Sequence, residues 1–335
     1  MINSYSLENY GPIRNAACHK AGRINLFIGP NRSGKTVLLK ALYTAIKTIE
    51  QNGRGKELRK DHDILFEKLY WTFQVDPLGK LVHNGAKSLK FQMNLGENQH
   101  FHYSFGNSTE RQVKDVDNTC KPRKMDSIFL PAKEIVSIQD IILGSREVDK
   151  VFGFDETYYD LAKSLRKQTV KGRNYPEFSE SRSMLETALG GHLEYDSKSR
   201  EWQFKEGNRT FSIMATSEGT KKMSILNTLL GNHYLKKGAI VFIDEPEAAL
   251  HPHLVSLFMD IIELLTHAGL QFFIATHSYF VIKKLYLIAH QKRMSIPVLS
   301  FGQDAGTDYG DMQDGMPENA IIDESVALYR EEITL

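Results

Sequence analysis

Eight consecutive residues have the types and the order needed to hold a polyphosphate. They read Gly29-Pro30-Asn31-Arg32-Ser33-Gly34-Lys35-Thr36 and match the pattern of a phosphate-binding loop. In such a loop the glycines let backbone N–H groups curl around the phosphates. The lysine reaches the β- and γ-phosphates, and the threonine hydroxyl binds Mg²⁺. An ordinary glycine-rich turn is the alternative, but a strand expected at Arg23 to Ile28 and a helix expected from Gly34 to about Glu50 favour the phosphate loop. ATP and Mg²⁺ are therefore the predicted ligands.

A second apolar strand ends in two acidic residues. Ile240 to Ile243 is followed directly by Asp244 and Glu245. Because strands buried in an α/β sheet present their C-terminal ends at the edge where ligands bind, both carboxylates are expected near the phosphate loop. Asp244 is predicted to hold Mg²⁺, directly or through water, and Glu245 to orient and polarise the attacking water. A strand that ends in a solvated acidic turn is the weaker alternative beside a phosphate loop.

The two motifs together resemble those of the ABC ATPases, a family that carries a signature motif between them. The chain has Thr216-Ser217-Glu218-Gly219-Thr220-Lys221-Lys222 where that family has Ser-Gly-Gly-Gln, so Glu218 replaces the first glycine. The Ser217 hydroxyl and the Gly219 N–H, ahead of a helix expected near Thr220, would form an anion site. In isolation the same residues would be interpreted as an ordinary helix N-cap. The resemblance implies that they meet the nucleotide of a second chain.

Two more sites follow from this resemblance. Thr276-His277-Ser278 follows a strand expected at Gln271 to Ala275 and resembles the switch histidine, which contacts the γ-phosphate. Glu245, His277 and Lys35 are thus the predicted catalytic residues. By its order in the chain, the family's glutamine loop falls at Lys133, Glu134 or Gln139, and Glu134 is assigned to the nucleotide site. Gln92 is the competing candidate, although its strand pattern points to a structural role.

The segment after Glu245 distinguishes branches of the family. It reads Pro246-Glu247-Ala248-Ala249-Leu250-His251-Pro252, whereas transporter subunits usually have Pro-Thr-Ser-Ala-Leu-Asp. This form resembles the SMC, RecF and OLD (overcoming lysogenisation defect) branch, whose members act on DNA or on partner proteins. Phe129 to Glu134 and Pro317 to Glu324 also resemble small bacterial ATPases of that branch, including those paired with nucleases in phage defence. The resemblance covers essentially the whole chain.

Composition limits the classes of partner. The chain has 335 residues and a net charge of +1, which gives no global electrostatic argument for nucleic acid or membrane. Cys18 and Cys120 form no disulfide or metal pattern, as expected in a reducing cytosol. The apolar stretches are too short to cross a bilayer, and the N-terminus lacks a signal layout. The prediction is a cytoplasmic protein with no membrane association.

Hydrophobic periodicity predicts the remaining elements. Gln51 to Asp63 is expected to be a loop, and Asp155 to Leu189 to be charged helix. A final helix is expected at Glu324 to Glu332. Further strands are predicted at Ile2–Asn9, Trp71–Val75, Leu89–Met93, Ser127–Leu130, around Leu193, Trp202–Phe204, Phe211–Ile213 and Ile296–Phe301, and a further helix at His253–Leu265.

These elements predict an α/β P-loop NTPase fold, an ABC ATPase head with a β-rich N-terminal part and a helical signature lobe. Residues 1–335 are expected to form a single domain. One lobe, about 1–132 plus 231–335, would hold the phosphate loop, the second motif and the switch histidine. The other, about 133–230, would carry the signature. Since each chain has one phosphate loop and one signature, two head-to-tail chains would bury two ATP molecules. A homodimer is predicted, and higher assemblies are left open.

Two functions of the ATP-bound dimer are considered. In the first, the closed dimer controls a separate effector, a nuclease or a toxin, in bacterial anti-phage defence. In the second, it is a DNA-repair ATPase of SMC or RecF type that clamps DNA directly. The absence of a coiled-coil pattern, the small size and the near-neutral charge favour the first, and a transporter subunit is a weaker third. No nuclease activity is expected in the chain itself, because Asp304, Asp308, Asp311 and Asp314 lie among glycines and little chain follows His277.

Overall fold

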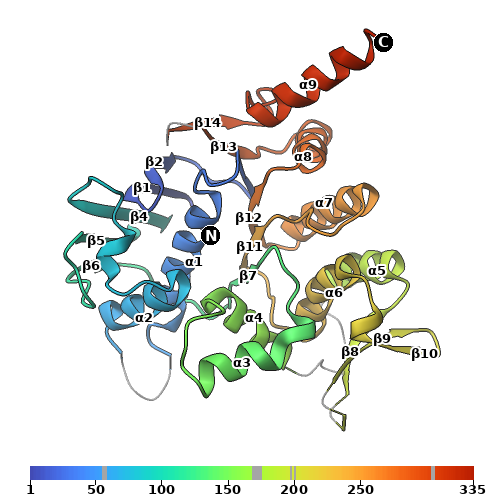
Figure 1. The fold of residues 1–335 in the computed structure, drawn as a ribbon, viewed down its shortest axis with the longest axis horizontal. Coiled ribbons are helices and arrows are strands. Elements are labelled where there is room, and N and C mark those ends of the chain that lie inside the picture. Colours follow the sequence, from blue (N-terminus) through green and yellow to red (C-terminus); the bar gives the residue numbers. More distant parts are fainter. Residues whose placement is uncertain (55–58, 168–175, 197, 200, 303–305) are drawn as a thin grey trace.

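The structure is a computed structural model that describes residues 1–54, 59–167, 176–196, 198–199, 201–302 and 306–335 (Figure 1). The strands are β1 (Ser4–Tyr10), β2 (Ile13–Cys18), β3 (Ile24–Ile28), β4 (Ser88–Gly96), β5 (Gln99–Gly106), β6 (Asp115–Asn118), β7 (Ile128–Leu130), β8 (His192–Asp196), β9 (Glu201–Glu206), β10 (Arg209–Ser212), β11 (Ile240–Asp244), β12 (Gln271–Thr276), β13 (Pro297–Phe301) and β14 (Thr307–Asp311). The helices are α1 (Lys35–Gln51), α2 (Asp61–Phe73), α3 (Gln139–Glu147), α4 (Glu156–Leu165), α5 (Pro176–Leu189), α6 (Glu218–Gly231), α7 (Pro252–His267), α8 (Tyr279–Lys292) and α9 (Ala320–Glu332).

The central sheet carries the chemistry-bearing loops. Within the described residues its strand order is β14-β13-β3-β12-β11-β7, and all neighbours are parallel except the edge strand β14. β3, β12 and β13 are buried along their whole length, and β11 as far as Ile243. A parallel sheet covered on both faces requires such continuous apolar strands, which explains why short apolar runs marked them in the sequence.

Successive residues of each strand point to opposite faces and join different cores. Leu26, Ile243 and Ile274 belong to the core on the side of α5 to α8. Phe27, Phe242 and Phe273 belong to the core on the side of α1. There the antiparallel sheet β2-β1-β4-β5-β6 closes the second core over α1, which confirms the β-rich N-terminal part (Figure 1).

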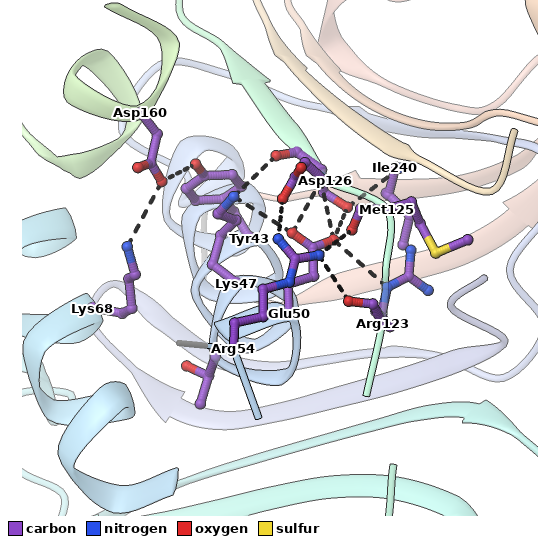
Figure 2. Close-up of polar contacts among 12 residues, drawn as sticks. Tyr43, Lys47, Glu50, Arg54, Lys68, Arg123, Met125, Asp126, Asp160 and Ile240 are labelled. Atoms are coloured by element: carbon purple, nitrogen blue, oxygen red, sulfur yellow. Dashed lines mark hydrogen bonds and ion pairs between the residues drawn. The ribbon is translucent and has the colours of Figure 1, made fainter. Parts of the chain in front are cut away.

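Buried polar contacts attach α1 to its neighbours (Figure 2). The Tyr43 hydroxyl donates to Asp160 of α4 at 2.6 Å. The Glu50 carboxylate accepts hydrogen bonds from the backbone N–H of Ser127 at 3.0 Å and from its hydroxyl at 2.6 Å, just before β7. Lys47 lies 3.5 Å from the same carboxylate. Since α1 starts at the phosphate loop, these contacts fix that loop relative to α4 and β7.

A mainly helical region, α3 to α6, follows β7 and includes the small antiparallel sheet β10-β9-β8, as the three short strands in the sequence predicted. Its apolar side chains, including Leu161 and Leu226, share one core with Ile243 of the central sheet. The predicted charged helix contains α4 and α5, while residues 168–175 within it lie outside the described part of the chain.

One predicted element is wrong. Trp71 to Val75 is not a strand, because α2 runs from Asp61 to Phe73 and takes up the end of the predicted loop as well. Its buried residues recur at a helical spacing, namely Ile64, Leu65, Lys68, Leu69 and Thr72. The local alternation around Trp71 was overruled by the longer helical face that packs on α1. The final helix also starts earlier than predicted, at Ala320. No helix in the described ranges is both long and apolar enough to cross a membrane.

Candidate nucleotide site

The turn between β3 and α1 needs its two glycines. Gly29 has φ of 145° and Gly34 has φ of 107°, conformations that side chains disfavour. A Cβ on Gly29 would lie 2.6 Å from the Phe301 carbonyl oxygen, and one on Gly34 would lie 2.6 Å from a carbon of Ile13. Positive φ and close packing thus both exclude other residues, and the backbone can curl as the motif predicts.

Lys35 turns back over this loop. Its Nζ donates to the carbonyl oxygens of Gly29 and Pro30, each at 2.8 Å. Burial lowers the pKa of Lys35, although Asp244 and the two acids after it partly oppose the shift. The ammonium therefore lies above the loop with weak neutral partners, which phosphate oxygens can replace with stronger charge-assisted hydrogen bonds.

The start of α1 fits an anion. Its N-cap, Gly34, provides no side-chain cap, and no acid lies in the first turn. The first N–H groups of a helix have no partner within it and form its positive end. Among the described residues, the Ser33 hydroxyl oxygen is buried with no hydrogen-bond partner. Asn31 and Arg32 are exposed on the same turn. The loop thus holds unsatisfied donors of the kind that phosphate oxygens satisfy.

Thr36 and Asp244 lie together beside this loop. The Thr36 hydroxyl is 2.9 and 3.1 Å from the two carboxylate oxygens of Asp244. Burial raises the pKa of Asp244 to about 6, while the Thr36 hydrogen bond opposes the shift. A hydroxyl and a buried carboxylate beside a phosphate loop are hard oxygen ligands, so this donor set fits Mg²⁺.

Glu245 turns its backbone sharply after β11. It has φ of 48°, a left-handed conformation that is uncommon outside glycine. Its N–H donates to the Ala275 carbonyl of β12 at 2.9 Å. The side chain is about a third exposed, so water can reach it. The carboxylate therefore stands at the sheet edge, close to Asp244 but open to solvent.

His277 reaches the same edge from β12. The strand register pairs Thr276 with Ile28, which precedes the phosphate loop. His277 Nδ1 lies 3.3 Å from a Glu245 oxygen and 3.7 Å from Glu247. The structure therefore brings Lys35, Thr36, Asp244, Glu245 and His277 into one neighbourhood.

Glu247 is a residue that sequence reasoning missed. Its Oε1 accepts hydrogen bonds from the Thr276 hydroxyl at 2.7 Å and from the His277 N–H at 3.2 Å. The other carboxylate oxygen is buried without a partner among the described residues. Glu247 thus fixes the backbone that presents His277. The acid in Pro246-Glu247-Ala248 was the available signal, but sequence alone did not say what it would touch.

The signature segment forms the start of α6. Ser217 is the exposed N-cap, and its hydroxyl oxygen accepts from the Thr220 N–H at 3.2 Å. The helix begins at Glu218 rather than near Thr220. A Cβ on Gly219 would lie 2.5 Å from the Ala249 carbonyl oxygen, so a glycine is needed where α6 meets the turn after β11. The role of Ser217 and Gly219 toward a second nucleotide stays a prediction.

The candidates for the glutamine loop separate clearly. Gln139 is buried, donates to the Ala162 carbonyl and accepts from Trp202, both at 2.7 Å, so both ends of its amide have structural partners. Gln92 lies exposed in β4. Glu134 accepts from the Ser137 N–H at 3.2 Å and lies 3.5 Å from Lys221. Lys133 is exposed. Glu134 remains the predicted residue, held by the signature helix.

Comparison with known proteins identifies the family. The sequence model described as "AAA domain, putative AbiEii toxin, Type IV TA system" matches residues 24–283. The chain belongs to this AAA family. No curated protein sequence matches it.

Solved structures agree on the fold of this AAA domain. An SMC head bound to the C-winged helix domain of ScpA is 13% identical, with a TM-score of 0.57 over 92% of this chain and 97% of that one. An SMC head with an extended coiled coil, bound to a ScpA domain derived from Pyrococcus furiosus, is 12% identical, with a TM-score of 0.51 over 100% and 99%. A RecF structure is 12% identical over 92% and 98%, with a TM-score of 0.47. The two SMC heads, with TM-scores above 0.5, show that the AAA domain has the ABC-type ATPase head fold predicted from its motifs.

Proposed function

We propose that the chain binds ATP with Mg²⁺ and hydrolyses it. The observation that carries the proposal is the contact between the Thr36 hydroxyl and the Asp244 carboxylate, at 2.9 Å, beside a phosphate loop with free donors. The parallel sheet holds a hydroxyl and a carboxylate beside an uncapped helix N-terminus, which supports binding of a metal and of phosphate at one place. That combination suits a metal-bound polyphosphate better than either component alone.

Each residue has a role in hydrolysis. The α1 N-terminus and Lys35 bind the phosphates and stabilise charge on the γ-phosphate as the bond to it weakens. Glu245 orients the attacking water and accepts its hydrogen bond. His277, 3.3 Å from Glu245, donates a hydrogen bond toward the γ-phosphate. Thr36 and Asp244 would hold Mg²⁺, which would supply neutralisation of the phosphate charge.

We also propose that two chains close over two nucleotides. Ser217 and the α6 N-terminus are exposed and can present a hydroxyl and N–H groups to an anion outside the chain. In this arrangement one lobe, about 1–132 plus 231–335, binds ATP, and the other, about 133–230, supplies the signature to the partner. ATP then acts as a conformational switch, because it binds the closed dimer more tightly.

The closed dimer would control a separate effector, a nuclease or a toxin in anti-phage defence, in the cytoplasm. Membership of a family associated with a putative AbiEii toxin of a type IV toxin–antitoxin system supports this output. A DNA clamp of SMC or RecF type is the alternative, and the net charge of +1 argues against it. Higher assemblies are compatible with either output.

The test combines turnover, binding and assembly. Purified chain should release phosphate from ATP only with Mg²⁺. Lys35→Ala should lose nucleotide binding, and equal turnover in this variant would reject the site.

Ser217→Arg, which places a bulky cation at the interface, should still bind one nucleotide per chain. It should neither dimerise with ATP in sedimentation nor hydrolyse ATP. Normal turnover in Ser217→Arg would reject the dimer. Purification of the native chain with ATP should retain an effector protein, whereas stoichiometric duplex DNA instead would favour the clamp.

A further inference from the structure

Lys222 of α6 reaches the backbone of the candidate catalytic residue. Its Nζ donates to the carbonyl oxygen of Glu245 and, at 3.2 Å, to that of Ala132. Ala132 follows β7 and Glu245 follows β11, so one ammonium joins the ends of two neighbouring strands. Only 6% of the residue is exposed. These contacts are independent of the phosphate loop.

The backbone that Lys222 contacts is strained. A non-glycine residue at φ of 48° persists only where the surroundings hold it, because the left-handed region is unfavourable for residues that carry a Cβ. Ala275 of β12 accepts the Glu245 N–H at 2.9 Å. Lys222 holds the other side, the carbonyl. Since the direction of the Glu245 side chain follows from its backbone, both hydrogen bonds determine where the carboxylate points.

The same helix is attached to this region at two more points. Gly219 packs against the Ala249 carbonyl in the turn after β11. Lys221 donates to the Ser137 hydroxyl at 2.9 Å and lies 3.5 Å from Glu134. α6 is therefore in contact with the segments that follow both β7 and β11, and its exposed end is Ser217.

Stability does not explain this lysine. Burial lowers the pKa of Lys222 to about 8, against the opposing effect of Glu247, Asp244 and Glu245. A buried ammonium whose direct partners are neutral carbonyls keeps a desolvation penalty that a methionine of similar length would avoid. The charge of Lys222 is thus unfavourable for folding, whereas its N–H donors reach the Glu245 carbonyl.

We propose that Lys222 is a positioning residue for hydrolysis, which fixes the Glu245 backbone and links the signature helix to the catalytic carboxylate. The inference rests on the proposed ATPase function. A shift of α6, such as contact with a nucleotide at Ser217 would cause, moves the ammonium and with it the Glu245 carbonyl. Each chain would then align its own Glu245 through the helix that it offers to its partner.

The test compares Lys222→Met with Lys222→Arg. The methionine variant keeps the packing and loses both hydrogen bonds, so kcat should fall at least about tenfold. ATP affinity, measured with a fluorescent ATP analogue, should stay within about twofold, because Lys222 does not touch the phosphate loop. The Tm should change little, because the loss of two hydrogen bonds is offset by removal of the desolvation penalty of the buried ammonium. The arginine variant, which can donate to both carbonyls, should recover most of the lost kcat.

Thr228→Val is the matched control. Thr228 is buried in the same helix, and its hydroxyl donates to the Ser224 carbonyl, at 2.8 Å, rather than to the catalytic segment, so kcat should be unchanged. Should Lys222→Met fail to fold, Lys222→Gln takes its place. Normal kcat in Lys222→Met, or a loss of ATP affinity equal to the loss of kcat, would overturn the inference while leaving the proposed function intact. A wild-type chain that hydrolyses no ATP would overturn both.

Discussion

The Thr36 hydroxyl lies 2.9 Å from the carboxylate of Asp244, although 208 residues separate the two in the sequence. One stands in the first turn of α1 and the other at the end of β11. Because this pair forms where two strand ends meet one helix N-terminus, its chemistry depends on the whole central sheet.

Asp244→Asn should stabilise the protein in the absence of metal and nucleotide. Burial raises the pKa of Asp244 from 3.8 to about 6, so the fold favours the protonated form. That contribution is complete below pH 3.8 and is lost as the pH rises through about 6. At pH 7.5 the wild type should carry a penalty on the order of 1–3 kcal/mol that asparagine removes.

Urea unfolding in EDTA at pH 7.5 and at pH 4 measures this difference. Asp244→Asn should have the larger free energy of unfolding at pH 7.5, and the gap should close toward pH 4. Addition of Mg²⁺ with ATP should stabilise the wild type more than the variant. Equal or lower stability of Asp244→Asn at pH 7.5 would contradict the prediction.

Glu245→Gln should keep ATP binding and lose turnover. The amide preserves the shape but cannot accept a hydrogen bond from water as a carboxylate does, so kcat should fall about a hundredfold or more. With hydrolysis blocked, the closed dimer should accumulate in the presence of ATP and be detected by sedimentation. Phosphate release at the wild-type rate would remove Glu245 from the catalytic set.

Gly219→Ala should destabilise the contact between α6 and the turn after β11. Its Cβ would lie 2.5 Å from the Ala249 carbonyl oxygen, so the backbone must shift. Thermal unfolding should show a loss of about 1–3 kcal/mol, with weaker ATP-driven dimerisation. Gly144→Ala in α3 is the control, since its Cβ meets nothing within 4 Å, and it should stabilise by about 0.5–1 kcal/mol. A Gly219→Ala chain as stable as Gly144→Ala would refute the close approach.

The purified chain should cleave neither DNA nor RNA with Mg²⁺ or Mn²⁺. The Asp311 carboxylate has a structural role, since it accepts hydrogen bonds from the N–H groups of Ile296 and Gln313, at 3.2 and 2.9 Å. Asp308 is exposed on the edge strand β14, and Asp304 lies outside the described residues. Gel assays of labelled substrates decide the matter. Cleavage that survives Lys35→Ala but disappears in Asp308→Ala with Asp311→Ala would show an intrinsic nuclease.

Many residues of the candidate site could be predicted from the sequence, because short local patterns mark the strands and the helix that position them. The short apolar strand before Gly29 and the apolar run before Asp244 indicate both burial and the position of the residue that follows. The helix after the phosphate loop follows from the 3.6-residue spacing of Leu38, Leu42 and Ile46. Such patterns need no knowledge of the partner strand.

The rest depends on contacts between distant segments. Gln139 suited a glutamine loop by its order in the chain, but Trp202 and Ala162 take both ends of its amide. Lys222 lies in the signature segment, and its burial follows only from contacts with Ala132 and Glu245, which come after β7 and β11. Trp71 to Val75 failed because five alternating residues cannot outweigh a longer helical face. The family resemblance, rather than periodicity, suggested the meaning of Ser217 and His277.

The strand order β3-β12-β11 determines when this site can exist during synthesis. β12 pairs with both of its neighbours, so nothing in the sheet joins β11 to β3 before Gln271 to Thr276 has left the ribosome. A nascent chain would expose a phosphate loop for most of its translation without the carboxylates that complete it. The long-range pairing makes this assembly slow, and ligand binding cannot stabilise the early intermediates fully. Emergence of β12 is thus the step that first allows Asp244 and Glu245 to reach the phosphate loop.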